Sequence, residues 1–219
     1  MELRLHRHGR FRRWLGAALG GDEELGDRAW RRIMHTSGSL VLIYYAIPVG
    51  FFVIAPKVDI LLSALAAMVV LELLRHLAGL ELPTLRPYES RRVASFLFFS
   101  VALVAAVLLF PLPIAAAVVL GTSLVDPIAG ELRSQRAAPL LAVGLPLAAY
   151  GLLAFVGMAA VGGWPAGDSA VLAVLIAPVA VAAERPKWSW MDDDLVMTVV
   201  PALVLYGVGV LALGLPAAG

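Results

Sequence analysis

Four groups of polar residues interrupt an otherwise apolar chain of 219 residues, and the first of them is RRIMHTSG at 31–38. Arg32 and His35 are three residues apart, so they share one face of a helix. Arginine offers a fork of donors that suits phosphate, and histidine offers a further donor or a proton carrier. The alternative for Arg31 and Arg32 is that they only anchor a helix at the lipid headgroups. This group therefore indicates phosphate recognition, headgroup anchoring or both.

The second group contains Glu72, Arg75 and His76. Spacings of three and four residues place Glu72 beside both partners on a helix, which is typical of a structural ion pair. A carboxylate within an apolar span costs about 2.5 to 3.5 kcal/mol on insertion scales, so it should face the protein interior, where a site role is equally open. The stretch that follows adds Tyr88, Glu89, Arg91 and Arg92. Headgroup anchoring is the simpler interpretation of that stretch.

The third group is GTSLVDPIAGELR at 121–133. Asp126 follows an apolar run, and the small residues around it would let a ligand approach the backbone closely. An acid embedded in a membrane segment is a candidate for function by default. The alternative is an Asp that caps a helix with Pro127 at the first helical position, and a cap could also serve a site.

The fourth group is the run Asp192, Asp193 and Asp194, which leads directly into the last apolar stretch. Adjacent carboxylates repel by about 4 kcal/mol at about 4 Å and an effective dielectric constant of about 20. A bound cation would remove that cost, and magnesium prefers one or two carboxylates with phosphate oxygens and water. The alternative is an exposed acidic helix N-terminus, which the helix dipole favours. Together with Glu184 and Asp126, the run predicts a nucleotide and magnesium site.

The elements that position these groups belong to a membrane protein. Apolar residues make up 61% of the chain, against about 45 to 50% in soluble domains. Cysteine is absent, which excludes disulfides and thiolate metal sites. Runs of about 17 to 25 apolar residues mark transmembrane helices. They predict seven spans, at 39–55, 58–78, 94–110, 112–125, 137–162, 168–184 and 195–215. We therefore expect an all-α polytopic membrane helix bundle.

The fourth predicted span, 112–125, is too short to cross about 30 Å as a straight helix. It is followed by Asp126 and Pro127. We therefore expect a broken helix whose irregular backbone faces protein or water rather than lipid.

The basic residues give the predicted orientation. With these spans, all of the 17 Lys and Arg except Lys57 fall on one side. The positive-inside rule then predicts a multi-pass protein of the cell membrane with a cytoplasmic N-terminus and an external C-terminus. Residues 1–34 should form an amphipathic interfacial helix and a lead-in helix, and residues 35–219 the transmembrane catalytic bundle.

The chain resembles the CTP-dependent polyprenol and dolichol kinases, to which phytol kinase and the CTP-dependent diacylglycerol kinase are related. The resemblance rests on five features in matching order over about residues 31–205: RRIMHTSG, Glu72 with Arg75, Tyr88 with Glu89, SLVDPIAG and MDDDLVMTVVP. Two positions depart from the family pattern. Asp194 stands where the family usually has Asn, and Val125 stands where many members have Gly.

The resemblance implies transfer of the γ-phosphate of CTP to the hydroxyl of an isoprenoid alcohol at the cytoplasmic face, with magnesium as cofactor. It implies catalytic roles for Asp126, His35 and Glu72, and magnesium binding by Asp126, Asp192, Asp193 and Glu184. The expected nucleotide or phosphate contacts are Arg31, Arg32, Arg75, Arg133, Lys187 and Asp194.

Two other classes of function remain open. A cytidylyltransferase that acts on a phospholipid acid would use the same CTP and magnesium but release pyrophosphate. A lipid transporter would also explain embedded acids and a broken span. The sequence has no G-x-x-x-x-G-K-[ST] loop, which argues against a P-loop kinase.

Overall fold

The computed structural model describes residues 17–18, 23–48, 51, 56–78, 92–184 and 191–217, and these residues contain helices and no strand. The helices are α2 (Glu23–Ser37), η1 (Gly38–Leu42), α3 (Ile43–Ala46), α4 (Lys57–Ala78), α5 (Ser95–Leu109), α6 (Leu112–Ser134), α7 (Pro139–Val156), η3 (Gly157–Val161), α8 (Ala166–Ala183), α9 (Asp193–Leu205) and η4 (Tyr206–Ala212). The expectation of an all-α protein is confirmed for this part of the chain. The amphipathic interfacial helix predicted at the start of the segment 1–34 falls outside it except for residues 17–18.

Four helices of the described chain are long and apolar enough to cross a membrane, rather than the seven that were predicted. They are α6, α7 with η3, α8, and α9 with η4, and they contain 18 to 23 residues each. At about 1.5 Å per residue, such lengths match a hydrocarbon core about 30 Å thick. α5 is apolar but has 15 residues. These helices indicate a protein of the lipid bilayer.

The predicted first span at 39–55 does not form one long helix in its described part. It contains the short helices η1 and α3, and α3 ends at Ala46. Ile47 is extended, with φ −78° and ψ 119°. It precedes Pro48, and a residue before proline is driven out of the helical region by contact with the proline ring.

The prediction of a broken fourth span is wrong. α6 is one continuous helix of 23 residues, and it passes through Pro127. Internal prolines also occur in α7, α8 and α9. Membrane helices tolerate proline because neighbouring helices and side-chain hydroxyls satisfy the backbone groups that it frees. Asp126 therefore projects from the side of a helix rather than from a break.

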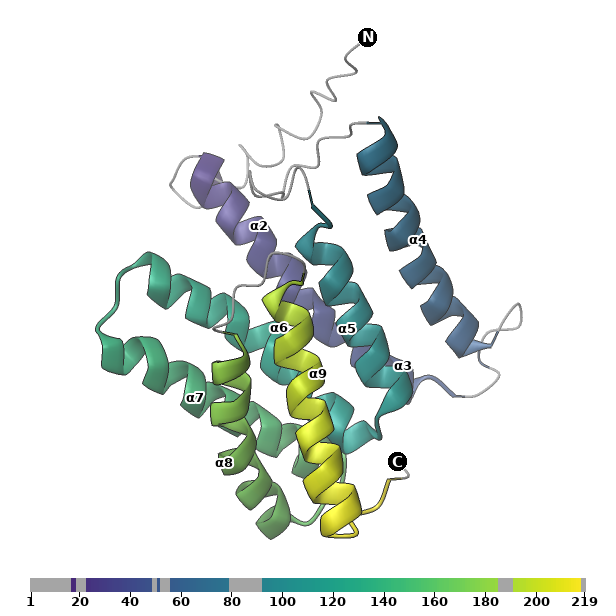
Figure 1. The fold of residues 1–219 in the computed structure, drawn as a ribbon, viewed down its shortest axis with the longest axis vertical. Coiled ribbons are helices and arrows are strands. Elements are labelled where there is room, and N and C mark those ends of the chain that lie inside the picture. Colours follow the sequence, from purple (N-terminus) through teal and green to yellow (C-terminus); the bar gives the residue numbers. More distant parts are fainter. Residues whose placement is uncertain are drawn as a thin grey trace.

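α6 lies at the centre of the bundle and packs against α2, α5, α7, α9 and η3 (Figure 1). Small residues allow the closest approaches. A Cβ atom on Gly157 would lie 2.5 Å from the backbone nitrogen of Ala117, and one on Gly121 would lie 2.4 Å from the ring of Tyr150. Helices in lipid associate through this kind of close packing, because the surrounding lipid tails are as apolar as the side chains.

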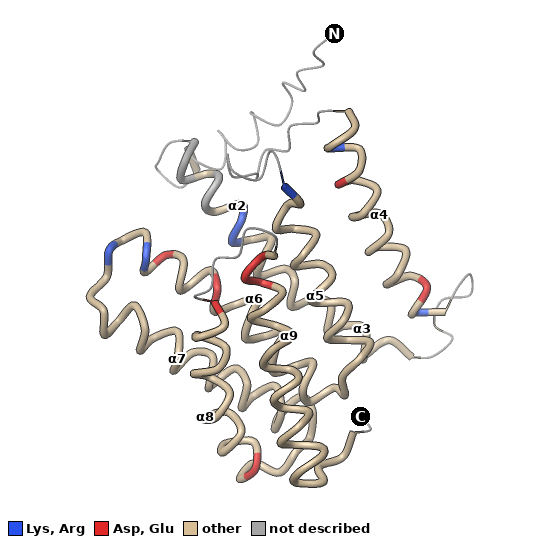
Figure 2. Tube along the Cα trace, in the orientation of Figure 1, with Lys and Arg blue, Asp and Glu red and all other residues tan. Residues whose placement is uncertain are grey.

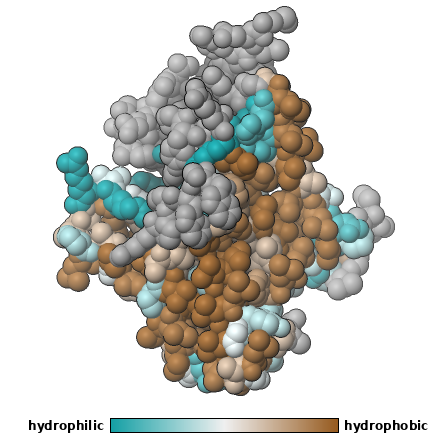
Figure 3. Space-filling model, in the orientation of Figure 1, coloured by the Kyte–Doolittle hydropathy of each residue, from teal (hydrophilic) through white to brown (hydrophobic). Residues whose placement is uncertain are grey.

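Most charged residues of the described chain gather at one end of the bundle (Figure 2). That end contains α2, the ends of α4, α6 and α8, and the starts of α5 and α9. Lys57 and Asp59 lie at the start of α4, and Asp168 lies at the start of α8, toward the opposite end. Apolar residues dominate the surface over the lower part of the view in Figure 3. An apolar bundle thus presents one polar end, which agrees with the segregation of charge predicted from the sequence.

Candidate functional site

Three side chains from distant segments meet at the charged end, and we call them the His–Asp cluster: His35 of α2, Asp126 of α6 and Asp194 of α9. Nδ1 of His35 lies 3.8 Å from Oδ2 of Asp126, and Nε2 lies 3.8 Å from Oδ2 of Asp194. One ligand atom from each residue falls within 4.8 Å of the others. Asp194 is buried, whereas His35 and Asp126 are each 21% exposed. The cluster is therefore embedded but open on one side.

His35 lies near the end of α2, which packs against α6, and the side chain also contacts α5. Its ring lies over the ring of Phe99, with the ring centroids 4.6 Å apart. Gly38 continues this contact, because a Cβ atom there would lie 2.5 Å from the Phe99 ring. Gly38 begins η1, and a side chain there would require the Phe99 ring to shift, so glycine allows the ring to stay against the imidazole of His35.

A hydrogen-bonded pair joins α6 and α9 one turn beneath the two acids. Oγ1 of Thr198 lies 3.0 Å from Oγ1 of Thr122 and 2.8 Å from the carbonyl oxygen of Asp194. A hydroxyl has one proton, so both contacts are satisfied when Thr122 donates to Thr198 and Thr198 donates to the carbonyl. Both threonines are fully buried. Because each is four residues from its acid, the pair fixes the register between Asp126 and Asp194.

The His–Asp cluster has the donors of a cation site. Carboxylate oxygens from Asp126 and Asp194 suit magnesium, which takes the rest of its ligands from phosphates and water. Two oxygens on one magnesium ion lie at most about 4.2 Å apart at bond lengths of about 2.1 Å. The candidate ligand atoms of His35, Asp126 and Asp194 all lie within 4.8 Å of one another, so a small side-chain movement would bring the carboxylate oxygens to that spacing. Asp126, which was predicted to bind the metal, and Asp194, which was predicted to contact the nucleotide, are thus brought together.

Arginines border the cluster. Nη2 of Arg133 lies 3.8 Å from Oδ1 of Asp126, and its Nη1 pairs with Glu184. The side chain of Arg133 is 51% exposed, so it faces both the cluster and the solvent. Arg32 forms an ion pair with Glu131, which joins α2 to α6. Arg31 lies next to Arg32 on α2 and is partly exposed.

Glu184 lies just beyond the end of α8, and its surroundings change its acidity. Burial raises the pKa of its carboxyl, while the adjacent Arg133 guanidinium partly offsets the rise. Glu184 was predicted to bind the metal. In the structure its carboxylate holds an arginine that in turn reaches Asp126.

Asp192 occupies a different position from Asp194 although both lie at the start of α9. As the N-cap of α9 it accepts a hydrogen bond from the backbone nitrogen of Asp194 at 3.3 Å. Its Oδ2 accepts a bond of 2.8 Å from the hydroxyl of Ser95 and lies 3.7 Å from Nη2 of Arg92. Burial and the neighbouring Asp193 raise the pKa of the Asp192 carboxyl. Asp193 follows in the first turn of α9 and is half-buried.

Glu72 and Arg75 form a buried clamp between α4 and the start of α5. Nε and Nη2 of Arg75 donate to the Glu72 carboxylate at 2.8 Å and 2.7 Å. Nη2 also donates to the backbone oxygen of Arg92 at 2.6 Å, and the backbone nitrogen of Ala94 donates to Glu72 at 2.9 Å. The two residues thus form an ion pair, with which their spacing was consistent. Catalytic and phosphate roles for the two residues remain predictions.

Lys187, an expected phosphate contact, lies outside the described chain, and so do Tyr88, Glu89 and Arg91 of the stretch after Glu72 and Arg75. Other residues of the site were not identified from the sequence. Phe99 gave no chemical signal, but helical spacing links Thr122 to Asp126 and Thr198 to Asp194, and this relation could have been recognised.

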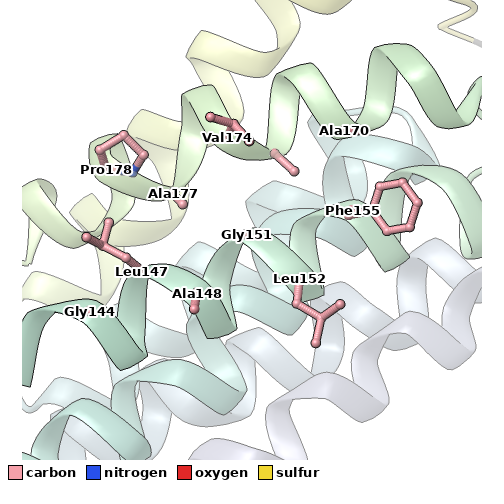
Figure 4. Close-up of a pocket in the computed structure, with 11 residues that line it drawn as sticks. Gly144, Leu147, Ala148, Gly151, Leu152, Phe155, Ala170, Val174, Ala177 and Pro178 are labelled. Carbon is pink, nitrogen blue, oxygen red and sulfur yellow. The ribbon is translucent and has the colours of Figure 1, made fainter. Parts of the chain in front are cut away.

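An apolar groove of about 630 Å³ lies between α7 and α8 (Figure 4). Small residues of α7 form part of its lining, and Leu147, Leu152, Phe155 and Val174 project around it. The described residues that line it include no charged side chain.

Comparison of the chain with protein-family models, curated proteins and solved structures gives no match.

Proposed function

We propose that this protein is an integral membrane kinase that transfers the γ-phosphate of CTP to the hydroxyl of a polyprenol or dolichol-type alcohol. The observation that carries the proposal is the convergence of His35, Asp126 and Asp194 at the charged end of an apolar bundle. Each comes from a different motif of the resemblance: RRIMHTSG, SLVDPIAG and MDDDLVMTVVP. Motifs that share one site should meet in space, as these three do.

The chemistry requires positioning and cancellation of charge more than covalent participation by the protein. Asp126 and Asp194 would hold magnesium, which when bound neutralises phosphate oxygens and orients them for transfer. Arg133 and Arg32 already pair with carboxylates on the rim, so an incoming polyphosphate would exchange those partners for its own oxygens.

The transfer itself involves one bond formed and one broken. The oxygen of the acceptor hydroxyl bonds to the γ-phosphorus while the bond from that phosphorus to the β–γ bridging oxygen breaks. CDP leaves, and the hydroxyl proton passes to His35, which lies against both acids. Since nucleotide is cytoplasmic, we place the charged end and the N-terminus on that side. This agrees with the bias of Lys and Arg.

Purified protein in detergent, supplied with γ-labelled CTP, magnesium and a panel of isoprenoid alcohols, tests the activity. We expect labelled lipid phosphate and CDP. Release of pyrophosphate with a cytidine-labelled lipid would instead identify a cytidylyltransferase. Lipid binding without transfer from CTP to any alcohol or acid would refute both enzyme assignments and favour a transporter.

Variants test the site. Asp126→Asn and Asp194→Asn should each lower turnover at least 100-fold and weaken Mn²⁺ binding measured by electron paramagnetic resonance, with the melting temperature retained. Asp168→Asn is the matched control, because Asp168 lies in the first turn of α8 at the other end of the bundle. Wild-type turnover and Mn²⁺ affinity in both cluster variants would contradict the assignment.

A further inference from the structure

The groove between α7 and α8 has the lining of a hydrocarbon site. α7 contributes Gly144, Ala148 and Gly151, and α8 contributes Ala170, Ala173 and Ala177. The small residues leave the space, and larger apolar side chains border it (Figure 4). Its volume of about 630 Å³ is that of a site for an organic ligand. With no charged side chain in the lining, the groove offers nothing to a polar headgroup.

The groove follows the bundle from its charged end inward. α7 starts at Pro139, shortly after the charged end of α6, and α8 runs back to Ala183 at the same end. Gly144 and Pro178 are therefore the lining residues toward the charged end, and Phe155 lies toward the other. Eleven residues separate Gly144 from Phe155, which is about 16 Å along a helix. The groove thus spans about half of a hydrocarbon core roughly 30 Å thick.

The charged end of the groove lies near residues that contact the His–Asp cluster. Pro178 precedes Glu184 by six residues, or about 9 Å along α8. Glu184 pairs with Arg133, and Arg133 lies 3.8 Å from Asp126. A chain that leaves the groove at Pro178 therefore meets polar groups of the cluster within a short distance.

We propose that this groove binds the hydrocarbon tail of the lipid alcohol that the protein phosphorylates, with the hydroxyl directed to Asp126. The inference rests on the proposed kinase function and specifies where the acceptor binds. A tail held along the groove places the hydroxyl at the cluster instead of leaving it free in the membrane, which lowers the entropic cost of reaction. An extended peptide is a poor occupant, because its backbone polar groups would have no partners in an apolar groove.

Filling the groove near the charged end tests the proposal. A Cβ atom on Gly144 would meet no atom within 4 Å, so Gly144→Phe and the smaller Gly144→Leu can occupy the groove without displacing the backbone. Gly167→Phe is the matched control, since Gly167 lies in α8 with equally open surroundings and does not line the groove.

The readout is kcat/KM for alcohols of one to ten isoprene units. We expect Gly144→Phe to lower kcat/KM at least tenfold for the long alcohols, with a smaller loss in Gly144→Leu. The shortest alcohol, which does not extend along the groove, should react as with wild type, and this also reports that the variants are folded. Equal losses at all chain lengths, or none at any, would overturn the proposal.

A second measurement does not depend on turnover. A long isoprenoid alcohol with a diazirine near its tail should label peptides of α7 and α8 on irradiation, and Gly144→Phe should reduce that labelling while Gly167→Phe should not. Labelling confined to α4 or α9 would overturn the tail site even if the kinase is active. Saturable labelling of α7 and α8 in a protein that transfers no phosphate would instead support the tail site and refute the kinase assignment.

Discussion

Arg75→Met tests whether the buried pair with Glu72 holds α4 on the bundle. Glu72 is 5% exposed and Arg75 is 4% exposed. The substitution removes both hydrogen bonds from Arg75 to the carboxylate and the bond to the backbone oxygen of Arg92. Glu72 then keeps the backbone nitrogen of Ala94 and, at 3.5 Å, Nδ1 of His76, but it loses its arginine partner. Removing one member of a buried pair costs about 3 to 5 kcal/mol, because the remaining charge is poorly compensated.

Thermal unfolding in detergent measures the effect. For a chain of this size, about 2 to 4 °C per kcal/mol gives a fall in Tm of roughly 6 to 20 °C. Hydrogen exchange should locate the loss in α4, which packs against α5. Asp59→Asn is the control, because Asp59 lies exposed on the same helix. It should leave Tm unchanged.

A double variant shows whether the loss of stability comes from an uncompensated charge or from lost packing. Replacing Glu72 by Leu together with Arg75→Met removes both charges, so it should recover much of the lost stability. A fall in Tm of less than 2 °C in Arg75→Met, with unchanged exchange in α4, would refute the clamp. A double variant less stable than Arg75→Met would show that charge compensation is not the reason.

Two further predictions concern the packing beneath the site. Thr198→Val should cost about 1 kcal/mol, within the range for hydrogen bonds between membrane helices, and should weaken Mn²⁺ binding at the His–Asp cluster. A double-mutant cycle with Thr122→Val should show coupling in unfolding, and additive losses would contradict it. Gly121→Ala should cost about 1 to 3 kcal/mol, because its Cβ would lie 2.4 Å from the Tyr150 ring. Gly144→Ala, which has open surroundings, should be neutral or stabilising in the same unfolding assay; equal losses would refute the packing argument.

Composition and charge predicted the broad architecture better than the helix boundaries. An apolar fraction of 61% indicated a membrane helix bundle, and the segregated charges agree with one polar end. Two prolines account for errors in the predicted helix boundaries. Pro48 follows the end of a short helix inside a predicted span, whereas Pro127 lies within a continuous one. The sequence alone does not distinguish these cases, because neighbouring elements decide whether the freed backbone groups find partners.

The acidic run at 192–194 is a second feature whose arrangement the sequence alone does not determine. The sequence identified Asp192, Asp193 and Asp194 as one group, and the structure gives Asp192 and Asp194 different partners. Adjacent residues of a helix point about 100° apart, so rotation of α9 determines which acid enters the cluster. Capping by Asp192, with its contacts to Ser95 and Arg92, sets that rotation and turns Asp194 toward His35.

The sequence by itself determined the helical class, the apolar character and the residue types available for chemistry, because these depend on local periodicity and composition. Only the tertiary structure decided that His35, Asp126 and Asp194 meet, and that the predicted Glu72–Arg75 pair becomes a clamp between α4 and α5. Such contacts depend on the rotation and close packing of helices whose residues are far apart in the chain. Glycines at 38 and 121 permit that packing, but the surfaces they meet are visible only in the folded protein.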